Sequence, residues 1–341
     1  MPPRAARFDH AGSTDNISRF LDARSLVPTR FRGTDKFLDV VSWNIRWFDA
    51  QDSSRVTAIY EVLKDLNADL LVLTEIQHDG ALDEVARRLA KSKAGYYSIH
   101  HGTTGGQQRV ALMWDRDWVI AKKDPHELFG AENLTVPAEL GAGRQDVFPR
   151  LPLWSWFEAK PADSSKEGFT FELVGLHLKA QGPAPKGYVG PSKTWGVPQR
   201  REATKRLVRW LGDKKAHVDP DVLVIGDWNA EPGRSEFAAL RTLEEEKKVS
   251  FTSINPTGEA SHLVRLVKSG ATGSRIDLHL VTKAADANAV PDGKGVVIRW
   301  KLFDDLAALS SKQREDLFKK LKQKFSDHLP VVSRFYLTDM P

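Results

Sequence analysis

Four short segments, far apart in this chain, each place a polar side chain at or just after the end of an apolar, strand-like run. The segments are Ser42–Ile45, Leu73–Ile76, Gly226–Asn229 and Ser326–His328. Because the ends of neighbouring strands meet at one edge of a sheet, side chains from distant segments can converge there. The chain is therefore constrained to a sheet-based fold in which its first and last parts contribute to one site.

Apolar periodicity predicts strands that alternate with amphipathic helices, and hence an α/β fold. Helices are expected at Arg55–Leu66, around Leu82–Leu89, at Gln199–Leu211 and at Ser310–Phe325. Strands are expected at Phe37–Ser42, Asp69–Glu75, Tyr96–His100, Arg109–Trp114, Leu153–Glu158, Phe169–Leu178, Val222–Gly226, Ile276–Thr282 and Leu329–Tyr336. Ser310 and Gln313 are spaced as a capping box. In the third helix, Arg200 and Arg206 are expected mostly on the outward face.

Residues 1–36 lack this periodicity and are expected to form a flexible arm, whereas residues 37–338 should form one domain. The absence of cysteine excludes disulfides, thiolate zinc sites and cysteine nucleophiles. Charges interrupt residues 1–36, and no run reaches the roughly 18 apolar residues of a membrane span, so we expect a cytoplasmic protein. The formal net charge of +5 permits an anionic partner such as nucleic acid. No sequence feature identifies a protein partner.

Oxygen-bearing side chains dominate the four segments, namely those of Asn44, Glu75, Asp227, Asn229 and Asp327. Carboxylate and amide oxygens suit Mg²⁺ or Mn²⁺ better than zinc. Since Mg²⁺ needs only one or two carboxylates, Glu75 with help from Asp327 or Asn44 would suffice for one ion. Each residue alone has an ordinary alternative, either a solvated strand-end carboxylate or a plain turn.

Histidines form the second group of candidates. His328 follows Asp327, and an imidazole held by a carboxylate such as Asp277 can exchange protons near neutral pH. His177 ends another strand. His262 and His279 fall near the Asp277 strand and are expected to be bystanders, although His279 shares its alternation with Asp277 and is the better placed to reach a cleft.

Two arginines, Arg109 and Arg150, precede strands. A guanidinium group suits bidentate contact with phosphate. In a chain with 50 Lys and Arg residues, a solvated surface charge is the ordinary alternative for each.

Together these motifs resemble the endonuclease/exonuclease/phosphatase superfamily, which has the deoxyribonuclease I-like fold. The resemblance runs in order from about Leu38 to Phe335. The matching motifs are Trp43–Ile45, Thr74–Glu75, Arg150–Pro152, Gly226–Asn229, Arg275–Asp277 and Ser326–Val331. The chain departs from the family pattern where Thr74 replaces the Gln that ordinarily precedes the metal-binding Glu.

The resemblance implies a four-layer α/β sandwich, two packed mixed β-sheets flanked by helices, that hydrolyses phosphate esters with Mg²⁺. In it, Glu75 would bind the metal with Asn44 and Asp327 close by. Asp227 and Asn229 would orient the attacking water and a phosphate oxygen. The remaining implied roles are proton uptake by Asp277 and His328, transition-state stabilisation by His177, and phosphate contact by Arg150 and, more loosely, Arg109.

His177–Leu178 stands where exonuclease III-like abasic endonucleases usually have an Asn-containing segment, so the chain resembles the His-containing nuclease and phosphatase branches. The leading hypothesis is a nuclease that hydrolyses DNA, and RNA as a further substrate. Basic stretches at 199–211 and 312–324 would contact phosphates, and the Gly/Pro loop 181–198 would border the cleft. The alternatives are a phosphatase or phospholipase-type hydrolase of a small or lipid phosphoester, and a catalytically inactive binding module.

Overall fold

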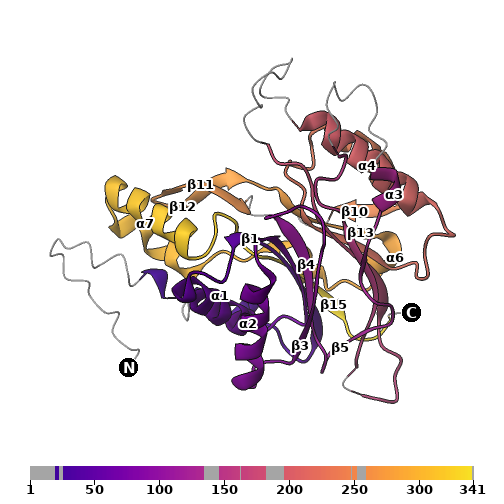
Figure 1. Ribbon diagram of the computed structural model, residues 1–341, viewed down its shortest axis with the longest axis horizontal. Helices are drawn as coiled ribbons and strands as arrows, with labels where there is room; N and C mark the ends of the chain where they lie inside the picture. The colour runs from indigo at the N-terminus through magenta and orange to yellow at the C-terminus, as the bar shows by residue number, and fades with distance from the viewer. Residues whose placement is uncertain are drawn as a thin grey trace.

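The structure is a computed structural model that describes residues 20–22, 26–133, 146–161, 163–181, 196–246, 248–251 and 259–339. Two mixed sheets dominate it, with strand orders β14-β15-β1-β2-β4-β3 and β10-β13-β9-β8-β7-β5 (Figure 1). The first sheet comprises β1 (Phe37–Phe48), β2 (Leu70–Ile76), β3 (Tyr97–His101), β4 (Arg109–Asp115), β14 (Val296–Val297) and β15 (Val331–Tyr336). The second comprises β5 (Val119–Ala121), β7 (Leu153–Ala159), β8 (Thr170–His177), β9 (Val222–Asp227), β10 (Val249–Phe251) and β13 (Asp277–Thr282), with β6 (His126–Glu127) paired to β7.

Helices cover the outer face of each sheet. On the first sheet they are α1 (Ser53–Leu66), α2 (Asp79–Lys91), the 3₁₀ helix η8 (Lys301–Ala308) and α7 (Ser311–Lys324). On the second they are α4 (Val197–Gly212) and α5 (Ala238–Glu245). The shorter helices are η3 (Thr29–Phe31), α3 (Gly130–Asn133), η6 (Ser235–Phe237), α6 (Lys283–Ala287) and η7 (Pro291–Gly293).

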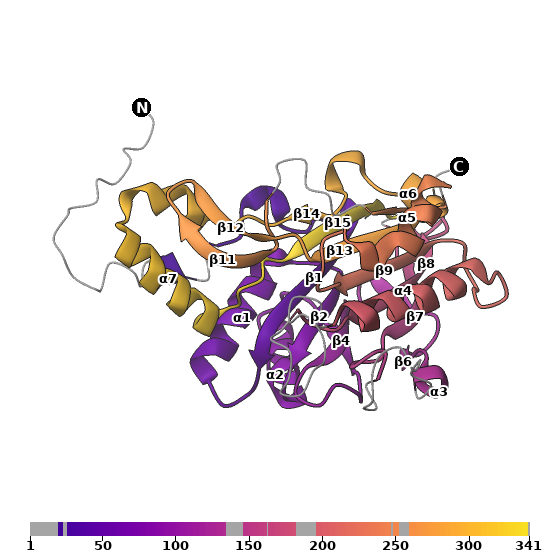
Figure 2. The ribbon, with the colours of Figure 1, turned by 90° about the horizontal axis from the view of Figure 1, so that it is seen from above.

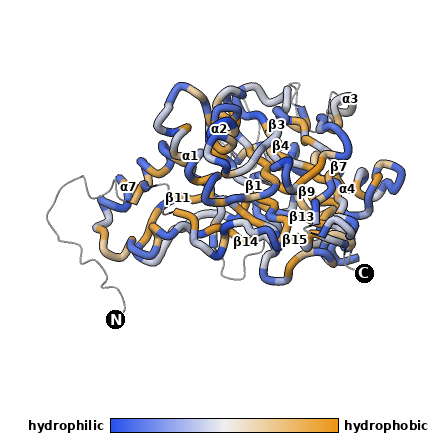
Figure 3. The backbone as a smooth tube through the Cα atoms, turned by 90° about the horizontal axis from the view of Figure 1, so that it is seen from below, coloured by the Kyte–Doolittle hydropathy of each residue, from blue (hydrophilic) through white to orange (hydrophobic). Residues whose placement is uncertain are grey.

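Three apolar clusters fill the three interfaces between these layers. Between the sheets, Leu38 and Val72 of the first sheet pack with Phe171 and Leu223 of the second. A cluster on each outer face holds the helices. Successive residues of a strand point to opposite faces, so β1 places Val40 in the inter-sheet core and its neighbours toward the helices. Hydrophobic residues follow the central strands (Figure 3). The predicted four-layer α/β sandwich is confirmed.

The predicted buried face of one helix and the predicted cap of another are confirmed. In α1, Val56, Ile59, Leu63 and Leu66 are all buried. Asp52 begins this helix by accepting hydrogen bonds from two backbone N–H groups of its first turn, which would otherwise lack partners. The predicted capping box at the start of α7 is also present.

Helix α4 is less exposed than the sequence predicts. Arg200 and Arg206, expected on the outward face, are 1% and 4% exposed. Arg200 is buried because its guanidinium pairs with Glu236 at 2.8 Å, and Glu236 comes from a segment 36 residues later. A pairing across this distance is invisible to helical periodicity.

A two-stranded hairpin, β11 (His262–Val267) and β12 (Gly270–Ser274), is absent from the predictions. It packs against α7 at one end of the molecule (Figure 2). Val264 and Arg265 are both exposed at an irregularity in its ladder, which breaks the alternation by which a strand is recognised.

Most of the predicted flexible arm, residues 1–19 and 23–25, lies outside the described residues. Of its remainder, Leu26 and Val27 are fully buried in the helix-covered face of the first sheet. The domain boundaries 1–36 and 37–338 stay predictions. None of the helices in the described part of the chain has the length and apolar character that a membrane span requires.

A buried carboxylate anchors β8, the strand that ends in the predicted site residue His177. Glu172 pairs with His217 Nδ1 at 3.1 Å. Its carboxylate also accepts hydrogen bonds from Trp154 Nε1, Val218 N and Asp219 N. Although burial favours the neutral form of both partners, the pair holds the pKa of Glu172 below its usual value and raises the pKa of His217 above 6.5.

We expect Glu172→Gln to lower the free energy of unfolding by about 3–5 kcal/mol, because it leaves buried donors without a charged partner. The stability from His217 is fully present below its unfolded pKa of 6.5 and is lost as pH rises through the raised folded pKa. In His217→Ala, the free energy of unfolding should therefore fall less steeply as pH rises from 6.5 through the folded pKa of His217. Urea unfolding between about pH 6 and pH 9 measures both effects. The control Glu158→Gln, which removes a half-exposed pair with Lys122, should cost about 0–1 kcal/mol.

Candidate active site

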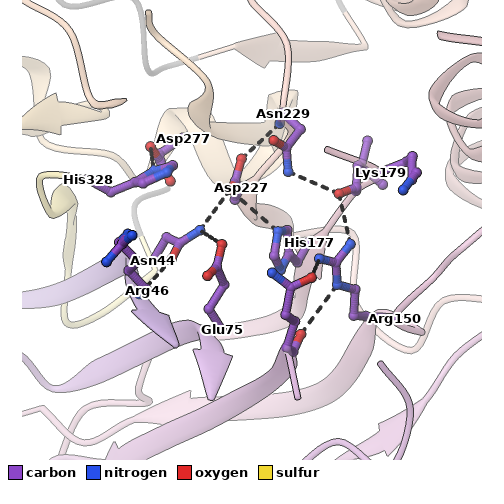
Figure 4. Close-up of polar contacts among 12 residues, drawn as sticks. Asn44, Arg46, Glu75, Arg150, His177, Lys179, Asp227, Asn229, Asp277 and His328 are labelled. Carbon is purple, nitrogen blue, oxygen red and sulfur yellow. Dashed lines mark hydrogen bonds and ion pairs between the residues drawn. The ribbon is translucent and has the colours of Figure 1, made fainter. Parts of the chain in front are cut away.

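The carboxylate, amide and imidazole groups singled out in the sequence converge at one end of the two sheets (Figure 4). Asn44 and Glu75 come from β1 and β2, which run parallel and side by side. Asp227 and Asp277 are direct register partners across the antiparallel pair β9 and β13. His328 lies three residues before the start of β15, the antiparallel neighbour of β1.

Asn44 connects the two sheets at this site. Its buried amide Nδ2 donates to Glu75 Oε1 at 2.9 Å and to Asp227 Oδ2 at 3.0 Å. The two acceptors belong to different sheets, so one amide fixes the spacing of two carboxylates. Asn44 Oδ1 in turn accepts from the backbone N–H of Arg46 at 2.8 Å.

The backbone around these residues is unusual. Arg46, Trp47, Glu75 and Asn229 all have φ between +46° and +61°, a region that costs energy for residues other than glycine. Gly226 has φ +140°, and a Cβ there would lie 2.1 Å from the carbonyl oxygen of Leu176. The motif Gly226–Asn229 therefore needs its glycine so that β9 can approach β8 closely.

Asp277 and His328 form a buried hydrogen-bonded pair. Asp277 Oδ2 lies 2.8 Å from His328 Nδ1. Ser261 Oγ accepts from the backbone of Asp277, and Ser326 Oγ accepts from the backbone of His328. Burial alone would favour the neutral imidazole, but the charge and hydrogen bond of Asp277, with Asp227 and Asp327 nearby, raise the pKa of His328 to about 10.

Asp227 lies beside this pair. Ligand atoms of Asp227, Asp277 and His328 all lie within 4.8 Å of one another. Burial and the like charge of Asp277 raise the pKa of Asp227 to about 7. Asp227 Oδ1 accepts from the backbone N–H of Asn229, whose side-chain amide donates to the carbonyl of Leu178.

His177 and Arg150 lie behind Asp227 (Figure 4). His177 Nε2 is 3.6 Å from Asp227 Oδ2, and the imidazole is almost fully buried. Burial and the nearby charge of Arg150 lower the pKa of His177 well below its usual value. Arg150 is itself buried, and its guanidinium donates to the side chain of Gln108 and, at 3.5 Å, to Leu178 O.

A cavity of about 350 Å³ opens in front of these groups. It is lined by Arg46, Trp47, Glu75, Ala180, Gln181, Asp227, Asn229, His262, Val264, Ser274, Ile276, Asp327 and His328. Asp327 faces it with a carboxylate that lies 3.3 Å from the guanidinium of Arg46. Residues from five strands and four connecting segments thus surround one volume large enough for a phosphate ester.

The endonuclease/exonuclease/phosphatase family model matches residues 41–328, which is most of the chain. The chain belongs to this family. Its members are phosphoester hydrolases, so the chain is a hydrolase of that type. The resemblance inferred from the motifs is confirmed. No curated protein matches the sequence significantly.

Solved structures of the family have the same fold. One is an endonuclease/exonuclease/phosphatase from Bacteroides vulgatus, at 14% identity and a TM-score of 0.51, with 88% of this chain and 99% of that chain covered. Another is the human Nocturnin catalytic domain with a bound sulfate anion, at 16% identity and a TM-score of 0.51, with 91% and 100% covered. At these identities the likeness concerns the fold alone.

Several predicted or neighbouring residues are not among the described residues that line the cavity of this family member, namely Asn44, Arg109, Arg150, His177, Asp277 and His279. Arg109 is tied to Asp79 at 2.8 Å and is not among the lining residues. His279 is fully buried and lies between the hydroxyls of Ser42 (2.9 Å) and Ser333 (2.7 Å). The expectation that His279 would reach the cleft sooner than His262 is wrong.

Of His262 and His279, it is His262 that lines the cavity, and its ring centroid lies 4.7 Å from that of His328. It belongs to the hairpin that periodicity missed. Arg46, Trp47 and Gln181 are further lining residues that sequence analysis did not single out. The loop predicted to border the cleft, 181–198, lies largely outside the described residues, but Gln181 donates to Asn229 O at 2.6 Å.

The donor set fits a hard divalent cation. Glu75, Asp227 and Asp327 bring three carboxylates to one cavity. Glu75 Oε1 accepts a hydrogen bond from Asn44 Nδ2, and Glu75 Oε2 accepts one from Trp47 N. Such oxygen donors suit Mg²⁺ or Mn²⁺. The family is generally dependent on a divalent metal, and these side chains provide the chemistry for one.

Proposed function

We propose that this family member is a divalent-metal-dependent phosphodiesterase whose substrate is a nucleic acid, DNA or RNA. The observation that carries the proposal is the buried Asp277–His328 pair, which lies beside Asp227 and shares one cavity with Glu75. The net charge of +5 supports a polyanionic substrate.

In this proposal Asp277 holds the imidazole of His328 through Nδ1, which leaves Nε2 to exchange a proton with a substrate or water oxygen. Asp227 and Asn229 orient the attacking water and a phosphate oxygen. His177, kept neutral by burial, lies 3.6 Å from Asp227 Oδ2 and stabilises the transition state through that carboxylate. The buried guanidinium of Arg150 contributes positive charge near Asp227 and His177.

Glu75, Asn44 and Asp327 are the residues that would hold the Mg²⁺ or Mn²⁺. When bound, such a cation supplies charge neutralisation at the phosphate and positions its oxygens. Asn44 sets the separation of the carboxylates on either side of it, and Arg46 holds Asp327 toward the cavity.

A substrate panel tests the proposal. We expect the purified protein with Mg²⁺ or Mn²⁺ to cleave single-stranded oligonucleotides or plasmid DNA, and EDTA to abolish cleavage. Glu75→Gln is the matched variant, because it keeps the side-chain shape while removing the charge, and it should raise the Mg²⁺ concentration needed for half-maximal rate.

Hydrolysis of a phospholipid or sugar phosphate, with no turnover of DNA or RNA, would reject the nuclease and support the phosphatase or phospholipase alternative. Affinity for nucleic acid without turnover in any metal would instead identify a binding module.

A further inference from the structure

Trp47 is a large apolar side chain held open to solvent beside the candidate active site. It is 43% exposed, whereas Trp43, four residues earlier on the same strand, is 1% exposed and packs edge-on against Trp300. Its φ of +52° is unfavourable for a bulky residue. Strain of this kind persists only where the surroundings impose it, and it concentrates at functional sites.

Both backbone polar groups of Trp47 are fixed by other elements. Its N–H donates to Glu75 Oε2 at 3.2 Å, and its carbonyl accepts from Arg55 Nη1 at 2.9 Å. Arg55, on α1, also donates through Nη2 to the carbonyls of Ile45, Arg46 and Phe325. One guanidinium group thus holds the distorted end of β1 and joins it to the segment that leads to His328.

The cavity next to the indole is mostly polar. Trp47 lines it together with Glu75, Asp327 and His328. Among its other described lining residues only Ala180, Val264 and Ile276 are apolar, so this part of the lining offers no continuous apolar path for an acyl chain. An exposed aromatic ring beside phosphate-binding chemistry is instead the arrangement that nucleic-acid-binding proteins use to stack bases.

We propose that Trp47 is a stacking platform for a nucleobase next to the scissile phosphate, and that the substrate is therefore base-bearing and single-stranded at that point. This inference rests on the proposed nuclease function. Arg55 is its positioning residue, because it fixes the strand end from which the indole projects.

The test compares a single-stranded oligodeoxynucleotide with an abasic chain of the same length and backbone. Trp47→Ala should raise KM for the base-bearing chain about 5- to 150-fold and leave KM for the abasic chain within about twofold. Trp47→Gly should behave alike, because glycine accepts the positive φ and only the ring is lost. Trp47→Phe should keep most of the affinity. The control Tyr96→Ala removes an aromatic of similar exposure, 41%, that does not line the cavity, and should change neither KM.

Equal rises in KM on both chains, or no rise on either, would overturn the stacking role while leaving the nuclease in place. If the wild-type protein turns over neither chain but hydrolyses a phospholipid or sugar phosphate, the proposed function itself fails and the stacking role with it. A selective rise in KM for a phospholipid in Trp47→Ala would assign the ring to an acyl chain.

Discussion

Replacing His328 with alanine should lower kcat by about 10²–10⁴-fold on the best substrate of the panel, the usual contribution of a general acid or base. The imidazole lies 2.8 Å from Asp277 and lines the cavity, which places it to exchange a proton with the substrate. Single-turnover kinetics in saturating Mg²⁺ would separate this loss from any change in binding. His126→Ala, at an exposed histidine on β6, is the control and should leave kcat unchanged.

Because His328 is buried, the alanine variant needs a second measurement that separates chemistry from folding. Asp277→Asn keeps the shape of the carboxylate but no longer fixes the imidazole tautomer, and we expect a loss of similar size. Residues that act as one unit give non-additive effects, so the double variant should be little worse than either single variant. If the losses of the two single variants multiply in the double variant, or if either folded variant keeps a near-normal kcat, the two residues do not act as one catalytic unit.

Asp227→Asn is the second change with a large expected effect, and it should move activity and stability in opposite directions. Both oxygens of Asp227 accept hydrogen bonds, one from Asn44 Nδ2 and one from Asn229 N. In the variant, the NH₂ group of the introduced amide faces one of these donors, so the side chain no longer orients the water and the phosphate. We expect kcat to fall about 10²–10³-fold, as when a single preorganised electrostatic group is removed.

The same change removes one of two buried carboxylates that are register partners across β9 and β13. Like charges at this spacing destabilise the folded state, so Tm measured in EDTA should be equal to or higher than that of the wild type. A variant that is both inactive and clearly less stable would show that Asp227 is mainly structural. Asn288→Asp, at a buried amide far from the cavity, should lower Tm and leave the catalytic parameters of the folded fraction unchanged.

Sequence periodicity predicted those features of the fold that are determined by residues close together in the chain. The inward face of α1 follows from helical periodicity, and the convergence of Asn44, Glu75 and Asp227 follows from polar residues placed at strand ends. The resemblance of the motifs to the family predicted the pairing of Asp277 with His328, two residues that lie 51 positions apart in the chain.

The errors arise where a distant partner decides the outcome. Strand alternation placed His279 on the same face of the strand as Asp277. At His279, however, this face points into the space between the two sheets, where serine hydroxyls from the other sheet hydrogen-bond to the ring. Arg109 was predicted to contact phosphate, a role that stays untested, and in the structure it pairs with Asp79. His262 was missed because its hairpin breaks the alternation that marks a strand.

The position of β15 has a consequence for shortened forms of the chain. This strand, which begins three residues after His328, inserts between β1 and β14, and Trp43 Nε1 donates to the carbonyl of His328. A chain cut short before His328 lacks both the imidazole that pairs with Asp277 and the strand that pairs with β1 next to Asn44. Under the proposed function, such a chain would show no turnover.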